Sequence, residues 1–202
     1  MSVTAVRLAC LAFLLILGAA RFYYGLSAKA RPSDEVSPPT DWSKCIPAYV
    51  TSSLWVAYVS GCIVWPNIMM EPYEIPFHWL GTPLLQWIGI VLMSIGLWLF
   101  WYSHRVIGHF WSIHVELKSS HELITDGPYR YIRNPLYTSF FLGYLGTMLA
   151  LNSWPLAVLA PFFVWSYVIF AKEEEDMLAP AFGEAYEAYK RRTGMFFFRL
   201  IK

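Results

Sequence analysis

The sequence predicts an all-α fold: a polytopic membrane bundle of about five transmembrane helices, followed by a C-terminal amphipathic cytoplasmic helix. The first observation behind this prediction is composition, because 57% of the residues are hydrophobic and 14% are charged, whereas soluble domains carry about 25% charged residues. The second is a series of apolar runs close to the roughly 20 residues that a helix needs to cross a bilayer. No linker separates two folded units, so residues 1–202 are expected to form a single membrane domain. A net charge of +1 gives no reason to expect a nucleic-acid partner.

Five apolar runs are the candidate spans. They cover residues 6–26, 49–70, 83–104, 136–151 and 154–171. Pro66 is expected to kink or end the second run, because proline cannot donate the helical hydrogen bond. Gly143 and Gly146 are expected to let a neighbouring helix approach the fourth run closely. Asn152-Ser153 is short and polar, so it is expected to turn the chain between the last two runs.

The first run has two interpretations, a retained span or a cleaved signal peptide with small residues at 18–20. Charge distribution favours retention, because basic residues near span ends prefer the cytoplasmic side. With five spans and the N-terminus outside, the outer loop 71–82 holds no Lys or Arg. The cytoplasmic segments then hold Lys29, Arg31, Lys44, Arg105, Lys118, Arg130, Arg133, Lys172, Lys190, Arg191, Arg192, Arg199 and Lys202. This topology predicts that the polar segment before the fourth run and the polar tail after the fifth face the cytoplasm together.

The polar segment 121–137, "HELITDGPYRYIRNPLY", is unusual beside a membrane span. Its two turn signals, Asp126-Gly127-Pro128 and Asn134-Pro135, predict a folded-back loop. Tyrosines supply flat faces and hydroxyls, and two arginines supply positive charge, so the loop is suited to a ligand with an aromatic ring and a carboxylate. The alternative is a membrane-entry loop, with tyrosine at the interface and arginine on anionic headgroups.

The polar tail is expected to form a helix, and Pro180 and Gly183 are expected to break it into two pieces. Phe182, Tyr186 and Tyr189 recur at spacings that place them on one face. This pattern is typical of an amphipathic helix on a membrane surface. Glu174 follows the last span closely, where a carboxylate is costly unless it is hydrated, paired or functional.

Parts of the sequence are also compatible with two other classes of protein. The four histidines His104, His109, His114 and His121 suggest a metal oxygenase, but their spacings of five, five and seven do not suit helical ligand pairs, and no metal site is expected. The three cysteines also lack metal-ligand spacing. A transporter or a non-catalytic scaffold is the other class, although no charged residue lies mid-span in the second to fifth runs.

The loop and the tail together resemble the isoprenylcysteine carboxyl methyltransferases and the related membrane phospholipid methyltransferases. The resemblance rests on "HELITDGPYRYIRNPLY" and, after a short hairpin, on "EEEDMLAPAFGEAYEAYKRRTG". The family pattern contains His-x-Leu-Val-Thr-x-Gly-x-Tyr, then Arg-His-Pro-x-Tyr, then a Glu-Glu pair, Phe-Gly and two spaced tyrosines. The similar region spans about residues 114–194, whereas residues 1–113 match only as hydrophobic spans.

The resemblance implies a multi-pass integral membrane methyltransferase that uses S-adenosylmethionine, has its active site on the cytoplasmic side and acts on a lipophilic acceptor. Carried over by position, the cofactor-binding residues are His121, Glu122, Leu123, Ile124, Tyr129, Asn134, Pro135, Leu136, Tyr137 and Glu174. The residues expected to take part in catalysis are Glu174, Arg133 and Tyr137. Methyl transfer from a sulfonium needs no metal, so the protein contributes alignment and exclusion of water.

Two departures from the family pattern bear on the acceptor. Asn134 stands where the family has histidine and keeps a hydrogen-bonding side chain. Phe170 stands four residues before Glu174, where the carboxyl methyltransferases have an arginine that holds the substrate carboxylate. A prenylcysteine carboxylate, a phospholipid amine and a small thiol therefore all stay open as acceptors. An amine must lose a proton, and Glu174 or His121 is a candidate base.

Overall fold

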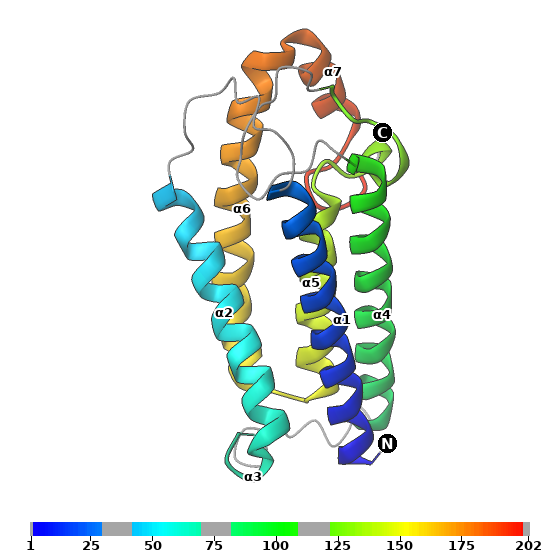
Figure 1. Ribbon diagram of the computed structural model, residues 1–202, viewed down its shortest axis with the longest axis vertical. Coiled ribbons are helices and arrows are strands. Elements are labelled where there is room, and N and C mark those ends of the chain that lie inside the picture. The colour runs from blue at the N-terminus through cyan, green and yellow to red at the C-terminus, as the bar shows by residue number, and fades with distance from the viewer. Residues whose placement is uncertain (1, 30–41, 70–81, 109–121, 200–202) are drawn as a thin grey trace.

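The computed structural model describes residues 2–29, 42–69, 82–108 and 122–199. Five long helices lie side by side, with α7 and the end of the chain gathered at one end of the bundle and α3 at the other (Figure 1). The elements are α1 (Val3–Lys29), α2 (Trp42–Val64), α3 (Pro66–Met69), α4 (Thr82–Ile107), the short 3₁₀ helix η3 (Gly127–Arg130), α5 (Pro135–Ala150), α6 (Trp154–Phe182) and α7 (Glu184–Arg192). The predicted all-α membrane fold is confirmed.

Four of these helices, α1, α2, α4 and α6, are long and apolar enough to cross a membrane. The fourth expected span, α5, has 16 residues and is about 24 Å long, less than the roughly 30 Å core of a bilayer. It packs among the longer helices and contributes Phe140 and Tyr144 to the shared core. Pro66 acts as expected, since α2 ends at Val64 and Pro66 starts α3.

Small residues bring α4 and α5 into close contact, as the glycines of the fourth run predicted. A Cβ atom on Gly146 would lie 2.7 Å from the carbonyl oxygen of Gly89, and one on Gly89 would lie 2.5 Å from that of Gly146. Gly143 faces α1 instead, because a Cβ there would meet the Phe13 ring at 2.5 Å. Such contacts leave no room for a larger side chain, so backbone packs directly on backbone.

Hydrogen bonds of hydroxyl and indole groups join α2 to the hairpin formed by α5 and α6. Ser52 and Tyr167 share a hydrogen bond of 2.8 Å, and the Trp55 indole donates to Thr147 Oγ1 at 2.9 Å. The hairpin turns at Asn152, whose φ of 49° lies in the left-handed region that asparagine tolerates better than most residues. The turn expected between the last two runs is therefore confirmed.

The tail differs from the expectation in two respects. α6 is one helix from Trp154 to Phe182, so Pro180 does not break it. A proline two residues from a helix end removes a single hydrogen bond, whereas the break needs the positive φ of 51° that Gly183 supplies. In addition, Tyr186 and Tyr189 are 1% and 3% exposed, so the aromatic face of α7 packs inside the protein rather than on a membrane surface.

Candidate active site

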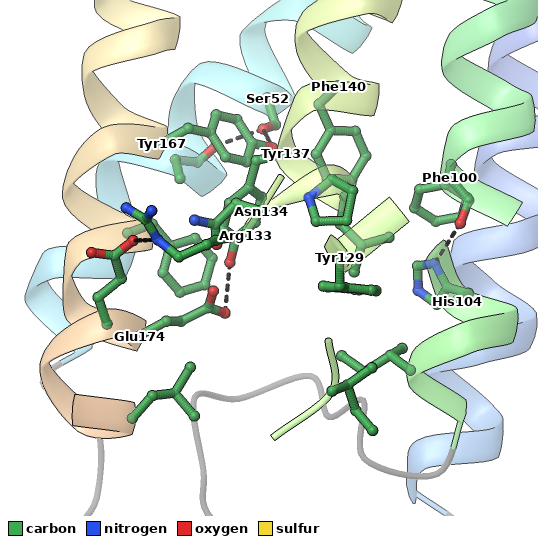
Figure 2. A pocket seen from close by; sticks show the side chains of 18 of the residues that line it. Ser52, Phe100, His104, Tyr129, Arg133, Asn134, Tyr137, Phe140, Tyr167 and Glu174 are labelled. Atoms are coloured by element: carbon green, nitrogen blue, oxygen red, sulfur yellow. Dashed lines mark hydrogen bonds and ion pairs between the residues drawn. The ribbon is translucent and has the colours of Figure 1, made fainter. Parts of the chain in front are cut away.

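A cavity of about 630 Å³ lies at the α7 end of the bundle and extends between the helices. It is lined from every side: α1, α2, α4, the loop 122–134, α5, α6 and α7 all contribute (Figure 2). Ten of the residues predicted for the site line it, namely Glu122, Leu123, Ile124, Tyr129, Arg133, Asn134, Pro135, Leu136, Tyr137 and Glu174. His121 lies outside the described residues. The loop and Glu174, separated in sequence by the α5–α6 hairpin, therefore meet around one space.

Local geometry explains the path of the loop. Gly127 has a φ of 56°, and a Cβ atom there would lie 2.8 Å from Val106 Cγ2 of α4, so only glycine fits this turn against the helix. Pro128 is the second residue of η3, which carries Tyr129 into the cavity wall. Pro135 is the first residue of α5, where a missing N–H costs nothing. The two turn signals read from the sequence thus set both ends of the loop.

Backbone contacts join the loop to the C-terminal segment. Arg133 N donates to Gly194 O at 2.9 Å, and Asn134 N donates to Met195 O at 3.0 Å. The Tyr189 hydroxyl of α7 donates to Tyr129 O at 2.7 Å. The loop is therefore held in place by the chain that follows α7, and the two polar stretches form one structural unit.

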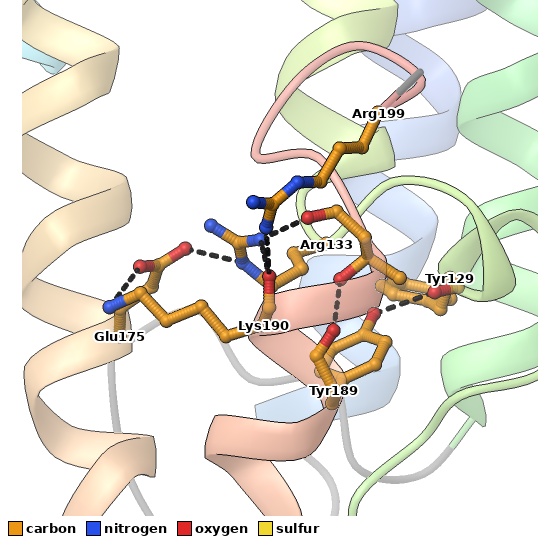
Figure 3. A network of polar contacts seen from close by, with 7 residues as sticks. Tyr129, Arg133, Glu175, Tyr189, Lys190 and Arg199 are labelled. Carbon is orange, nitrogen blue, oxygen red and sulfur yellow. Dashed lines mark hydrogen bonds and ion pairs between the residues drawn. The ribbon is translucent and has the colours of Figure 1, made fainter. Parts of the chain in front are cut away.

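Arg133 is the centre of a polar network beside the cavity (Figure 3). Its Nε donates to Glu175 Oε1 at 2.8 Å, and its Nη1 donates to Thr193 O at 2.6 Å and Lys190 O at 3.2 Å. The Arg133 and Glu175 side chains are 8% and 6% exposed. Lys190 Nζ lies 3.3 Å from Glu175 Oε2. Through these contacts Arg133 joins α6, α7 and the loop.

Glu174, next to this network, faces the cavity itself. The Tyr137 hydroxyl donates to Glu174 Oε1 at 2.7 Å, and the Tyr137 ring packs 5.6 Å from the Phe170 ring, centroid to centroid. The neighbouring acidic residue, Glu173, points elsewhere and pairs with Lys44 at 2.6 Å. Glu174 therefore presents its carboxyl group to a space whose walls are largely aromatic and aliphatic (Figure 2).

Two buried polar atoms at the cavity have no partner in the described part of the chain: Tyr129 Oη and Asn134 Nδ2. Burial and the Glu174 charge raise the pKa of Tyr129 well above its usual range, so the hydroxyl stays protonated and can donate. Buried donors are nearly always satisfied in folded proteins. Two such donors beside a carboxylate are therefore the expected mark of a site that takes a polar, charged ligand.

Some cavity residues were not identified from the sequence, notably Arg21, Tyr49, His104 and Phe140. They come from α1, α2, α4 and α5, where apolar residues lie on all sides and periodicity does not reveal the face that lines a cavity. Arg21 carried a usable signal, since a charge inside a span is rare and usually functional. Across the described residues, no group of three or more His, Cys, Asp or Glu is arranged to hold a metal ion.

Comparison with known proteins gives several similarities. The family model for phospholipid methyltransferases matches residues 84–185, half of the 202-residue chain. The cobalt-zinc-cadmium resistance protein CzcN of Cupriavidus metallidurans is 36% identical over 125 residues, covering 61% of this chain and 55% of CzcN. Protein-S-isoprenylcysteine O-methyltransferase of Rattus norvegicus is 27% identical over 155 residues, covering 74% of this chain and 51% of the rat protein.

The fold has a counterpart among solved structures. The eukaryotic intramembrane Ras methyltransferase ICMT (isoprenylcysteine carboxyl methyltransferase) matches with a TM-score of 0.51 and 24% identity, over 77% of this chain and 52% of that one. The chain spans about half the length of the curated relatives it matches. The four long apolar helices and the family match identify an integral membrane protein. Because the matched region takes in α4, the cavity loop, α5, α6 and the start of α7, this chain belongs to the phospholipid methyltransferase family.

Proposed function

We propose that the chain is a methyltransferase that transfers the methyl group of S-adenosylmethionine to a lipophilic acceptor at the cytoplasmic end of the bundle. The observation that carries this proposal is the composition of the cavity. One end has a polar wall formed by Tyr129, Asn134, Tyr137 and Glu174, and the cavity continues between the helices along aromatic and aliphatic side chains. A polar donor and an apolar acceptor can therefore occupy one space from opposite ends.

The residues of the polar wall fit this cofactor. Its amino acid end carries an ammonium group and a carboxylate, and Glu174 is an acceptor suited to the ammonium. The unpartnered donors Tyr129 Oη and Asn134 Nδ2 suit the carboxylate or the acceptor atoms of adenine. The apolar side chains of Leu123 and Ile124 supply surface for a flat ring. The volume of about 630 Å³ falls within the range of about 300–1,000 Å³ usual for small-molecule sites.

The cofactor, when bound, supplies an electrophilic methyl group on a sulfonium. The chain's own residues then orient and desolvate the reactants. Tyr137 fixes the Glu174 carboxylate through its 2.7 Å hydrogen bond. The Arg133 network holds the loop and α7 around the cavity, so we assign Arg133 a positioning role in catalysis. His121 stays a predicted cofactor contact, with Glu122, Pro135 and Leu136 as the adjoining wall.

The acceptor is proposed to enter sideways from the membrane, beside α2. Ser53, Val56 and Ala57 all line the cavity and all keep exposed surface. This opening lies within a helix long and apolar enough to cross a bilayer, where an acyl or prenyl chain is soluble. A carboxylate acceptor, as in S-prenylcysteine, needs no base because it already carries the nucleophilic electron pair.

A phospholipid amine is the second candidate acceptor. The observation that favours it is Glu174, a carboxylate inside the cavity that can accept the proton an ammonium must lose before it attacks. With a carboxylate acceptor Glu174 only binds the cofactor, whereas with an amine it also acts as the base.

The experiment is methyl transfer by the purified full chain in lipid nanodiscs, with a methyl-labelled cofactor. S-farnesylcysteine and phosphatidylethanolamine are offered separately. Base-labile label in the first acceptor supports a carboxyl methyltransferase, and base-stable label in the second supports an amine methyltransferase. Failure to bind the cofactor product S-adenosylhomocysteine, together with no label in either acceptor, contradicts the proposed activity.

A further inference from the structure

Arg21 is a positive charge placed inside a membrane-spanning helix. It lies two turns before the end of α1 at Lys29, about 12 Å along the helix axis. α1 is long and apolar enough to cross a bilayer. A charge at such a depth is costly unless it faces a cavity or an opposite charge. The groups around Arg21 therefore indicate which partner its guanidinium binds.

The Arg21 side chain faces the cavity. Its Cζ lies 5.1 Å from the centroid of the Phe140 ring, and Tyr49 and Tyr167 line the same space as Arg21. A cation–π contact with phenylalanine is weak compared with the cost of removing a guanidinium from water. The Phe140 ring therefore orients Arg21 but does not neutralise it.

No ion pair joins Arg21 to a carboxylate in the described part of the chain, including Glu122, which lines the same cavity. On α6, Glu173 pairs with Lys44 and Glu175 pairs with Arg133, while Glu174 accepts a hydrogen bond from Tyr137. Arg21 takes part in none of the ion pairs found there. A guanidinium with five donors in a planar fork is suited to a carboxylate or phosphate, so the missing partner matches an oxyanion of a ligand.

Arg21, Tyr49 and Glu174 all line this cavity. The rings of Tyr49, Phe170 and Tyr137 follow one another along the wall, with centroid separations of 6.2 Å and 5.6 Å.

We propose that Arg21 binds the oxyanion of the lipophilic acceptor, with the acceptor's hydrocarbon tail along Leu17, Trp55 and Val56 of the same cavity. This inference rests on the proposed function and narrows its substrate class to amphiphiles that carry an oxyanion. For a carboxylate acceptor, an oxygen–methyl bond forms as the sulfur–methyl bond breaks; the donor leaves as a neutral thioether and no proton is released. For a phospholipid amine, Arg21 holds the phosphate, a nitrogen–methyl bond forms, and the ammonium proton passes to Glu174.

The test compares Arg21→Gln with a matched control, Arg7→Gln, on the same helix. Arg7 does not line the cavity. Both variants are assayed as full chains in nanodiscs for S-adenosylhomocysteine affinity, for affinity to S-farnesylcysteine and its uncharged methyl ester, and for affinity to phosphatidylethanolamine. Arg21→Gln should weaken the binding of one of the two ligands that carry an oxyanion by about 10–100-fold, the usual effect of losing a hydrogen bond to a charged group.

The same substitution should leave S-adenosylhomocysteine affinity unchanged, and Arg21→Lys should restore part of the lost affinity. A loss of affinity for S-farnesylcysteine, with no loss for its methyl ester, would show that Arg21 binds a carboxylate. A loss of affinity for phosphatidylethanolamine would show that Arg21 binds a phosphate. Equal acceptor affinities in wild type and Arg21→Gln overturn the role of Arg21 and leave the proposed activity intact. An equal loss of S-adenosylhomocysteine affinity also overturns it, because Arg21 would then belong to the cofactor end. Absence of S-adenosylhomocysteine binding in the wild type contradicts the proposed function itself.

Discussion

Among single residues, Glu174 is the one whose charge is hardest to explain by folding alone. It faces a cavity with mostly apolar walls and accepts a hydrogen bond from Tyr137. Its neighbours Glu173 and Glu175 are neutralised by Lys44 and Arg133. A cationic ligand group would give Glu174 the partner that each neighbour already has.

Glu174→Gln is expected to reduce S-adenosylhomocysteine affinity by about 10–100-fold, because a charge-assisted hydrogen bond is replaced by a neutral one. Isothermal titration calorimetry on the detergent-purified chain measures this. Glu173→Gln is the matched control, since Glu173 does not line the cavity, and its affinity should equal that of the wild type. Unchanged affinity in Glu174→Gln would remove this residue from the site.

The substitution Tyr129→Phe removes only the hydroxyl oxygen, so it distinguishes an effect on ligand binding from an effect on folding. Its hydroxyl has no partner in the described part of the chain, so removing it should not lower the melting temperature of the free protein. It should weaken S-adenosylhomocysteine about 2–10-fold, the effect of one neutral hydrogen bond. Tyr189→Phe is the comparison, because it removes the 2.7 Å bond to Tyr129 O and should cost about 1 kcal/mol of stability. A melting temperature that falls equally in both variants would mean that the Tyr129 hydroxyl is structural.

Between elements, the Arg133–Glu175 ion pair joins the loop to α6, and the Arg133 bonds to Lys190 O and Thr193 O extend it to the end of α7. Arg133→Met alone should cost about 3–5 kcal/mol, because it leaves Glu175 charged and buried. Arg133→Met/Glu175→Met should cost much less, and chemical denaturation followed by tryptophan fluorescence measures both. Lys190→Met is the control; its side chain is 43% exposed, so its contribution should be about 0–1 kcal/mol.

The same variants decide the role of Arg133 in the site. If Arg133 only positions the loop, the folded double variant should still bind S-adenosylhomocysteine with nearly wild-type affinity. Complete loss of binding in a double variant that folds would instead assign Arg133 a direct contact with the ligand.

The α4–α5 contact is a second prediction between elements. Gly146→Ala places a Cβ atom 2.7 Å from Gly89 O and from Met93 Cγ, and such overpacking should cost about 1–3 kcal/mol. Gly18→Ala on α1 is the matched control, because a Cβ there meets nothing within 4 Å and alanine favours a helix. Thermal unfolding in detergent compares them. Equal melting temperatures would show that the two helices are less closely packed than described.

For the molecule as a whole, the sequence could predict what local pattern determines. The lengths of the apolar runs predicted the long helices, and Asn152-Ser153 predicted the last turn. The motifs of the loop and tail predicted the residues around the cavity. The prediction that Pro180 breaks the tail helix was wrong, because a proline near a helix end removes too few hydrogen bonds to end the helix. His104 was not identified as a cavity residue, because it reaches the cavity through packing of α4, and a uniformly apolar helix carries no signal for which face turns inward. Arg21 could have been identified, because a charge inside a span is rare and usually functional.

The central claim is that the loop before α5 and the carboxylate at the end of the last span form one binding site for a methyl donor. Titration of the purified wild-type chain with S-adenosylhomocysteine tests it most directly. The account predicts saturable one-to-one binding that is weakened by both Tyr129→Phe and Glu174→Gln, one change on each side of the hairpin. No binding to a folded wild-type chain, or binding that is indifferent to both substitutions, would contradict it.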